Sequence, residues 1–489
     1  MSKSLKDFKE LHSPMFSSDR PLKQFGLERK FSKGGKSFII TAAQNGTPVN
    51  KEWWDILLNM SERLQAELLV IPIRYKNPTS KWSASSANEE YWVPEVMPYL
   101  WNQRNLLNKN IMVLGDIKTQ PTAVSPLTGF DAFSSAVSGI IGHTKIQLKA
   151  VPSTNNRMGK ILTTTGACTI PNYTDSRAGA VGEFHHSLGA VIVEIDSPTR
   201  YFLRQLHYDQ RTSSCTDLDK RYFADRVEKA PRALALVMGD THVDSVDPSV
   251  MHATFGKGGI VPTLKPEHLI WHDLLDGYSV NPHHAGKPLI KVGKLVGKVG
   301  DARSEVQRAI DFIAEHTPKR TTSVVVPSNH NDFLSRWIDT HDWKTDPLNA
   351  EFYLETALAM VRGTTHTPRG TEYPEAFGYW LRQAELSNCK VLDIDESFML
   401  ADVELGMHGN LGPNGVRGSI LNLRRISNKS IIGHSHTPGI EEGCYQVGTN
   451  TYLRLEYTHG ASSWLNADCV LNADGKRQLL IIVDGKWRK

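Results

Sequence analysis

One pattern recurs through the second half of this chain: a short apolar run that passes directly into a polar cluster. After Pro231 the runs are RALALVMGD, HLIWHD, TTSVVVPSNH, KVLDIDE and KSIIGHSH, and each ends in a cluster containing Asp, Asn or His. Between them, SEVQRAIDFIAEHT repeats Val306, Ile310 and Ile313 at helical spacing. Strands alternating with helices form α/β sheets, which carry their sites at strand ends. This half is therefore predicted to be an α/β domain with a polar site at one sheet edge.

The first half predicts a separate α/β domain over residues 37–228. A strand–helix–strand unit is predicted for the successive segments SFIITAA, EWWDILLNMSERLQ and ELLVIPIRY. This order favours a parallel arrangement of the two strands. Further strands are expected at 110–117, 145–150 and 189–195, and TDLDKRYFADRVEKA is expected to be helical. No chemical motif stands out in this half. Residues 1–36 predict either a mobile basic arm or an ordered packing strap.

The composition excludes several classes of protein. At 489 residues, with 40% hydrophobic and 22% charged residues, the chain suits a soluble protein of two to four domains. No apolar run is long enough for a membrane span, and the first residues lack the apolar core of a signal peptide. Five scattered cysteines without a CxxC pair indicate a reducing cytoplasm. The net charge of +4 neither requires nor excludes a nucleic-acid partner.

Five short motifs in the second half carry the candidate chemistry. In chain order they are Asp240-Thr241-His242, His272-Asp273-Leu274-Leu275-Asp276, Ser328-Asn329-His330-Asn331-Asp332, His408-Gly409 and Gly433-His434-Ser435-His436. This order resembles the calcineurin-like metallophosphoesterase superfamily, whose pattern is D-x-H, GD-x-x-D, GNH-D/E, H and GH-x-H. The resemblance covers residues 229–489 and implies a β-sheet sandwich flanked by helices.

The resemblance also implies two divalent metal ions and a role for each motif residue. The first ion would be held by Asp240, His242 and His436, the second by Asn329, His408 and His434, and Asp273 would bridge them. Such a pair clamps a phosphoryl oxygen and supplies a hydroxide nucleophile at neutral pH. The mixed nitrogen and oxygen ligands suit Mn²⁺ first, with Fe²⁺, Zn²⁺ and Mg²⁺ as alternatives.

Three further residues have expected catalytic roles. His330 matches the family histidine that approaches the phosphate, so it would stabilise the transition state and protonate the leaving oxygen. Asp276 and Asp332 are candidates for orienting His330 or a metal ligand. The alternative interpretation is that these two carboxylates only stabilise a turn or cap a helix.

Two positions depart from the family pattern. His272 and Ser328 stand where the family has glycine, so the loops near the metals could differ in geometry. Neither change removes a ligand. His272 is either an additional substrate contact or a histidine packed beside the sheet.

The motifs restrict the class of phosphoester that the protein could hydrolyse, but they leave more than one substrate class open. Protein phosphatases of the superfamily carry arginines in the second and third motifs, whereas this chain has HDLLDG and PSNHND. The layout is similar to bacteriophage early proteins that degrade host DNA as manganese-dependent DNases, which implies a DNA substrate in the host-cell cytoplasm. A small-molecule phosphodiesterase or phosphatase and a non-catalytic scaffold are the alternatives. The N-terminal domain could support homo-oligomers, and KVGKLVGKVGD is expected to form a surface hairpin.

Overall fold

The computed structural model describes residues 36–73, 92–154, 159–284, 286–368, 370–455 and 458–489. The arm predicted for residues 1–36 therefore lies outside the described residues, apart from Lys36. The described part is a mixed α/β structure, which confirms the predicted class at that level. Its strands form a seven-stranded, a six-stranded and a ten-stranded sheet, with one small two-stranded sheet.

The seven-stranded sheet is built on the predicted strand–helix–strand unit. β1 (Ser37–Gln44) and β2 (Ala66–Ile73) are parallel and are joined by α2 (Lys51–Arg63). α2 begins after Asn50, whose side chain accepts a hydrogen bond from the Trp53 amide at 3.0 Å. Its buried face, which includes Trp53 and Trp54, packs on the sheet. The remaining strands are β8 (Gly189–Ile195), β9 (Tyr201–Asp209), β10 (Ser214–Asp217), β11 (Lys220–Tyr222) and β12 (Val227–Lys229).

The prediction of a helix for TDLDKRYFADRVEKA is wrong, because this segment contributes to the antiparallel strands β10, β11 and β12. Asp217 at the end of β10 accepts hydrogen bonds from the Arg204 guanidinium of β9 at 2.6 and 2.7 Å. Cys215 and Tyr222 are buried in the same cluster as Trp53. These contacts with distant parts of the chain fix the segment as strands.

The six-stranded sheet contains the strands that carry the first three motifs. Its order is β18 (Cys389–Val391), β15 (Thr322–Val325), β14 (His268–Trp271), β13 (Ala235–Val237), β24 (Asn466–Leu471) and β25 (Arg477–Ile482). The first four strands are parallel, and β24 and β25 form an antiparallel hairpin around the turn NADG.

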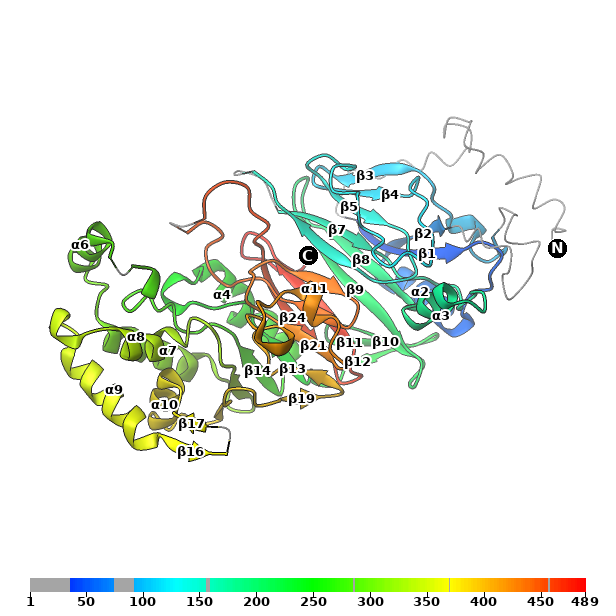
Figure 1. Ribbon diagram of the computed structural model, residues 1–489. Coiled ribbons are helices and arrows are strands. Elements are labelled where there is room, and N and C mark those ends of the chain that lie inside the picture. The colour runs from blue at the N-terminus through cyan, green and yellow to red at the C-terminus, as the bar shows by residue number, and fades with distance from the viewer. Residues whose placement is uncertain (1–35, 74–91, 155–158, 285, 369, 456–457) are drawn as a thin grey trace.

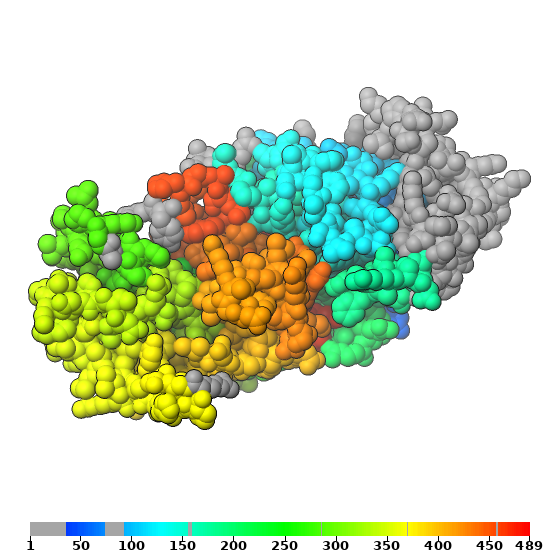
Figure 2. Space-filling model, viewed as in Figure 1, coloured from blue at the N-terminus to red at the C-terminus, as the bar shows by residue number. Residues whose placement is uncertain are grey.

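The ten-stranded sheet draws strands from both halves of the chain. Its order is β19 (Met399–Leu400), β20 (Val403–Glu404), β21 (Lys429–Ile432), β23 (Cys444–Gln446), β22 (Gly439–Glu441), β6 (Leu148–Val151), β7 (Lys160–Thr164), β5 (Ser138–Ile141), β4 (Ile111–Leu114) and β3 (Arg104–Asn108). The halves join where Ile440 of β22 pairs with Leu148 of β6, and the corresponding orange and cyan segments lie directly against each other in Figure 2. The sheet thus crosses the boundary expected at residue 229.

Most of the helices other than α2 and α3 lie near the six-stranded sheet. The helices that follow α2 along the chain have the bounds given next. They are α3 (Arg177–Phe184), α4 (Pro248–Phe255), α5 (Ile260–Leu264), α6 (Pro288–Gly297), α7 (Ala302–His316), α8 (Phe333–Thr340), α9 (Ala350–Gly363), α10 (Ala376–Gln383) and α11 (Ile420–Leu423), and a hairpin of β16 (Thr365–Thr367) and β17 (Gly370–Glu372) lies beside them. Figure 1 shows α6 to α10 at one end of the molecule and β1 to β5 at the other. Within the described residues, none of the helices has the length and apolar character needed to cross a bilayer.

Two apolar clusters lie on opposite sides of the six-stranded sheet. On one side α7 buries Val306, Ile310 and Ile313, at the predicted helical spacing, in a cluster with Leu269 and Trp271 of β14. On the other side the six-stranded and ten-stranded sheets share a core. The segment KVGKLVGKVGD, expected to be a hairpin, is instead largely the helix α6, which starts at Pro288 in a position where its missing amide costs nothing.

Candidate metal centre

The site is assembled where the two sheets of this shared core present their loops. β13, β14 and β15 are parallel neighbours, so their carboxyl ends meet at one edge. Asp240 and His242 follow β13, Asp273 follows β14, and Asn329 and His330 follow β15.

The ten-stranded sheet supplies the other three motif residues. His434 and His436 follow β21, and His408 lies in the loop after β20. The two sheets are tied together at this point, since the backbone amide of His434 donates to Asp240 Oδ1 at 3.1 Å. Residues that are up to almost 200 positions apart in the sequence therefore meet in one place.

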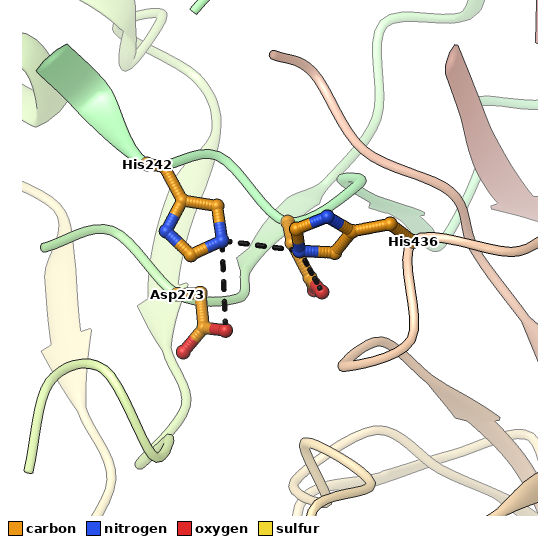
Figure 3. A group of neighbouring side chains, drawn as sticks. His242, Asp273 and His436 are labelled. Carbon is orange, nitrogen blue, oxygen red and sulfur yellow. Dashed lines mark hydrogen bonds and ion pairs between the residues drawn. The ribbon is translucent and has the colours of Figure 1, made fainter. Parts of the chain in front are cut away.

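The first group of converging side chains contains Asp240, His242, Asp273 and His436. Nε2 of His242 lies 3.1 Å from Nε2 of His436 and 3.8 Å from Asp273 Oδ2, and Nε2 of His436 lies 3.1 Å from Asp240 Oδ2. Figure 3 shows the rings of His242 and His436 and the carboxylate of Asp273 turned toward one another. All four residues are buried.

A second group surrounds Asn329. Its Oδ1 lies 3.0 Å from Nε2 of His408 and 2.9 Å from Nδ1 of His434. Nε2 of His408 also lies 3.2 Å from Asp273 Oδ2. Asp273 thus belongs to both groups, and the structure brings together all seven residues that the sequence nominated as ligands.

The spacing of these atoms fits the coordination of metal ions. Nitrogen and oxygen ligands bound about 2.0–2.2 Å from one ion lie about 2.8–3.6 Å from each other in tetrahedral or octahedral geometry. Five of the six distances fall in that range, and only the separation of His242 from Asp273, 3.8 Å, is slightly longer. Oδ2 of Asp240 is buried and faces Nε2 of His436 at 3.1 Å, so both atoms could turn to a cation placed between them. These buried donors could therefore hold a divalent metal ion.

The charges of the buried carboxylates are maintained by their histidine neighbours. Burial alone raises the pKa of Asp240, but the hydrogen bond with His436 and the charges of His408 and His436 outweigh it and hold the pKa at about 2. The pKa of Asp273 is also far below its usual value, because the nearby histidines, with His408 the strongest, outweigh burial. Both side chains therefore offer negative oxygens to a cation.

The histidines divide into two electrostatic classes. Burial lowers the pKa of His242 to about 3 and also lowers the pKa of His434, so both rings stay neutral, as a metal ligand must be. The pKa of His408 is raised, because the charge of Asp273 outweighs burial. Metal binding at His408 would therefore release a proton.

The backbone at the site adopts conformations that side chains rarely allow. His242, Asp273, His434 and His436 have φ values of 44°, 43°, 76° and 57°, in the left-handed region. Such residues cost about 1–3 kcal/mol each and cluster at functional sites. Gly433 is required for another reason: a Cβ there would overlap Asp240 Oδ1.

His330 lies beside the first group. Its ring meets that of His242 edge to face, with centroids 4.4 Å apart. Its Nδ1 donates to the backbone carbonyl of Asp276 at 2.7 Å, which leaves Nε2 as the nitrogen available to a substrate. The backbone amide of His330 donates to Asp273 Oδ1 at 3.2 Å, so this loop is fixed by the carboxylate shared between the two groups.

The two carboxylates proposed to orient His330 occupy different positions. Asp276 orients the ring through its backbone oxygen, whereas its carboxylate accepts a hydrogen bond from Ser245 at 2.6 Å. Asp332 lies at the start of α8, where burial raises its pKa and Arg336 opposes that effect. Within the described part of the chain, no hydrogen bond joins the carboxylate of Asp332 to His330 or to a candidate ligand.

Comparison with known proteins places the chain in a family. No defined domain family matches it. It is 30% identical over 475 residues to Protein A1 of Escherichia phage T5, a match that covers 93% of this chain and 83% of that protein. The chain belongs to the phage T5 Protein A1 family. In this A1-family protein, the matched region extends far beyond the five motifs into the first half of the chain.

Two residues at the centre of this A1-family protein support the candidate ligands without being candidate ligands themselves. Of the two expectations for His272, the structure supports the histidine packed beside the sheet, because His272 is fully buried and its Nδ1 lies 3.3 Å from Nδ1 of the candidate ligand His408. Asn331 accepts a hydrogen bond from the Leu275 amide at 3.1 Å, so it fixes the loop that carries Asp273. The only signal in the sequence was that His272 replaces the family glycine.

The site opens into a cavity of about 1430 Å³. Asp273, Asn329, His330, His434 and His436 line part of its wall. The other candidate ligands, Asp240, His242 and His408, do not line the cavity and are only 0% to 3% exposed. The cavity therefore reaches the candidate centre on the side of His330. A substrate would therefore reach the ligands and His330 from the same side.

Proposed function

We propose that this A1-family protein is a two-metal phosphodiesterase that hydrolyses DNA, with Mn²⁺ as the first candidate metal. The observation that carries the proposal is that two groups of ligands share Asp273 at the wall of a large cavity, with His330 beside them. The motif order and the core shared by two sheets support a calcineurin-like metallophosphoesterase fold for residues 229–489.

Each group of residues has a separate task in the proposed reaction. Asp240, His242 and His436 would hold one ion, Asn329, His408 and His434 the other, and Asp273 both. Bound together, the two cations would polarise the phosphoryl oxygens and lower the pKa of the attacking water. The buried carboxylates keep their negative charge and so maintain affinity for both cations.

His330 is suited to act on the leaving group. Its Nδ1–H is held by the Asp276 carbonyl, so Nε2 is the atom that can carry a second proton toward the cavity. A protonated Nε2 would stabilise negative charge on the phosphate and then donate its proton to the departing oxygen. The contact with His242 fixes the plane of the ring while it does so.

DNA is favoured over smaller substrates by the residues around the site. The second and third motifs lack the arginines that grip a phosphomonoester in protein phosphatases. The cavity of about 1430 Å³ exceeds the range of roughly 300–1000 Å³ typical of small-ligand pockets. Because the relative belongs to a phage, we propose host DNA in the bacterial cytoplasm as the target.

Hydrolysis of two substrates in parallel tests this function. The protein is incubated with Mn²⁺, Mg²⁺ or Zn²⁺ and either duplex DNA or bis-p-nitrophenyl phosphate, with a chelator as control. Cleavage of both substrates that the chelator abolishes is expected. Cleavage of the aryl ester alone would support a small-molecule phosphodiesterase instead, and metal binding without any hydrolysis would support a scaffold.

A further inference from the structure

Several positive side chains line the cavity that leads to the candidate metal centre. Lys287, Lys298, Arg336 and Arg417 line it and are exposed. Within the described part of the chain, none of the four has a carboxylate within 4 Å. Arg308, the fifth cation of the lining, differs because Asp244 accepts two hydrogen bonds from it at 2.6 and 2.7 Å. Unlike Arg308, these four cations meet no carboxylate among the described residues, so they are available to an external anion.

Two of these cations lie at the ends of α6. Lys287 precedes its first turn and Lys298 follows its last turn. A helix of ten residues is about 15 Å long, so the two charges are separated by roughly the rise of four to five base pairs. The helix dipole disfavours a lysine at the N-terminal end, so Lys287 does not serve the stability of α6.

A third lysine holds α6 against the cavity. Nζ of Lys294 donates to the Ser279 carbonyl at 3.1 Å and lies 5.2 Å from the centre of the Tyr278 ring. This contact leaves Lys287 and Lys298 on the cavity side, although α6 itself stands out at the end of the molecule (Figure 1). The helix therefore carries two charges beside the path of a substrate.

The other two cations come from different elements. Arg336 lies on α8, directly after the loop of His330, and Arg417 lies in the loop between β20 and β21, which also carries His408. The interior of the cavity is acidic, since Asp273 and Asp276 line it, whereas these cations lie among its exposed residues. The positive charge of the lining thus comes from three separate parts of the fold.

We propose that Lys287, Lys298, Arg336 and Arg417 bind backbone phosphates that flank the one being hydrolysed. This inference rests on the proposed function and deepens it, because it makes a nucleic-acid strand of several nucleotides the preferred substrate. Cations that neutralise phosphates release counterions, so binding should weaken with salt by a slope of about 0.9 per contact on duplex DNA. The modest net charge of +4 does not oppose this, because the charge is local.

A fourfold alanine variant, K287A/K298A/R336A/R417A, tests the proposal. For duplex DNA we expect KM to rise at least tenfold and the salt slope to fall by about 3 to 4. The turnover of bis-p-nitrophenyl phosphate should stay within twofold, because the aryl ester has no flanking phosphates. The matched control is K291A/R425A, which removes one exposed lysine of α6 and one exposed arginine near α11 that do not line the cavity.

The possible outcomes distinguish failure of phosphate binding by the four cations from failure of the proposed DNase activity. If the unmodified protein cleaves the aryl ester but no DNA, the DNase function fails first. If it cleaves DNA and the fourfold variant keeps its KM and salt slope, the four cations do not bind the backbone. A parallel loss of aryl-ester turnover would also overturn the proposal, and R336K/R417K, which retains the charges, should keep the original salt slope.

Discussion

Oδ2 of Asp273 lies 3.2 Å from Nε2 of His408. The same oxygen lies 3.8 Å from Nε2 of His242, which belongs to the other group of ligands. One buried carboxylate therefore faces both halves of the centre. Two dications held close together need a shared negative ligand to offset their repulsion, so the proposed two-metal centre would depend on Asp273 more than on any other single side chain.

The first prediction concerns that side chain. Asp273→Asn keeps the shape of the residue but removes its charge, so the protein should bind fewer than one metal ion per chain. Turnover should fall by roughly 10²–10³-fold or more, the scale for losing a main electrostatic contact. Metal content measured by mass spectrometry after gel filtration checks this, and a variant that retains two ions would contradict the bridging role.

The second prediction separates His330 from the ligands. His330→Gln should lower the turnover of DNA by roughly 10²–10⁴-fold while the metal content stays unchanged. The loss should be much smaller for bis-p-nitrophenyl phosphate, because p-nitrophenolate leaves without needing a proton. Steady-state kinetics on both substrates provide the measurement, and equal losses on the two would show that His330 is not the acid.

The local pattern of the sequence predicted polar clusters at the ends of parallel strands, and the resemblance to metallophosphoesterases implied which of their residues would be ligands. Asp240, Asp273 and Asn329 each come a few residues after β13, β14 and β15, so the strand pattern alone brings them to one edge. The orientation of His330 was not predictable, since the acceptor is the backbone oxygen of Asp276 and its carboxylate faces Ser245. A backbone carbonyl leaves no mark in the sequence.

The third prediction concerns His272. If Nε2 of His408 binds metal, its Nδ1 carries the proton, and Nδ1 of His272 at 3.3 Å is the acceptor that holds it. His272→Leu should therefore weaken Mn²⁺ binding by roughly 10–100-fold, and His272→Asn should recover part of the loss. Competition with a fluorescent chelator measures this affinity. Unchanged binding by His272→Leu would mean that His272 only fills space.

The fourth prediction follows from a buried carboxyl group behind the site. Asp468 on β24 is fully buried and accepts a hydrogen bond from the Gly239 amide at 2.9 Å, and burial raises its pKa to about 7. The folded state thus holds its proton to higher pH than the unfolded state, whose value is about 3.9. The stability contributed by this group should fall as pH rises from about 4 through 7.

Asp468→Asn should remove that dependence, because the amide stays neutral and can still accept from Gly239. At pH 8, with metal removed by a chelator, the variant should unfold with a free energy higher by roughly 1–3 kcal/mol, whereas near pH 4 the two proteins should match. Denaturant unfolding at both pH values measures this, with Asp311→Asn, an exposed change on α7, as control. A variant less stable than the original at pH 8 would contradict the assignment.

The parts of the fold that local pattern missed depend on contacts between distant residues. Asp217 is held by Arg204, and this ion pair favours strands where the sequence suggested a helix. The pairing of Ile440 with Leu148 joins strands almost 300 residues apart, and no local signal announces it. In α6, the glycines suggested a hairpin, but Pro288 starts a helix that Lys294 ties to Ser279.

A titration of metal-free protein with Mn²⁺ tests most directly whether Asp273 joins two ions in a centre that cleaves DNA. Bound metal and DNA cleavage are followed together. We expect cleavage to rise mainly as the second ion binds, with two ions bound per chain at full activity. Full cleavage with one ion per chain, or no cleavage with two, would contradict a centre in which Asp273 joins two ions.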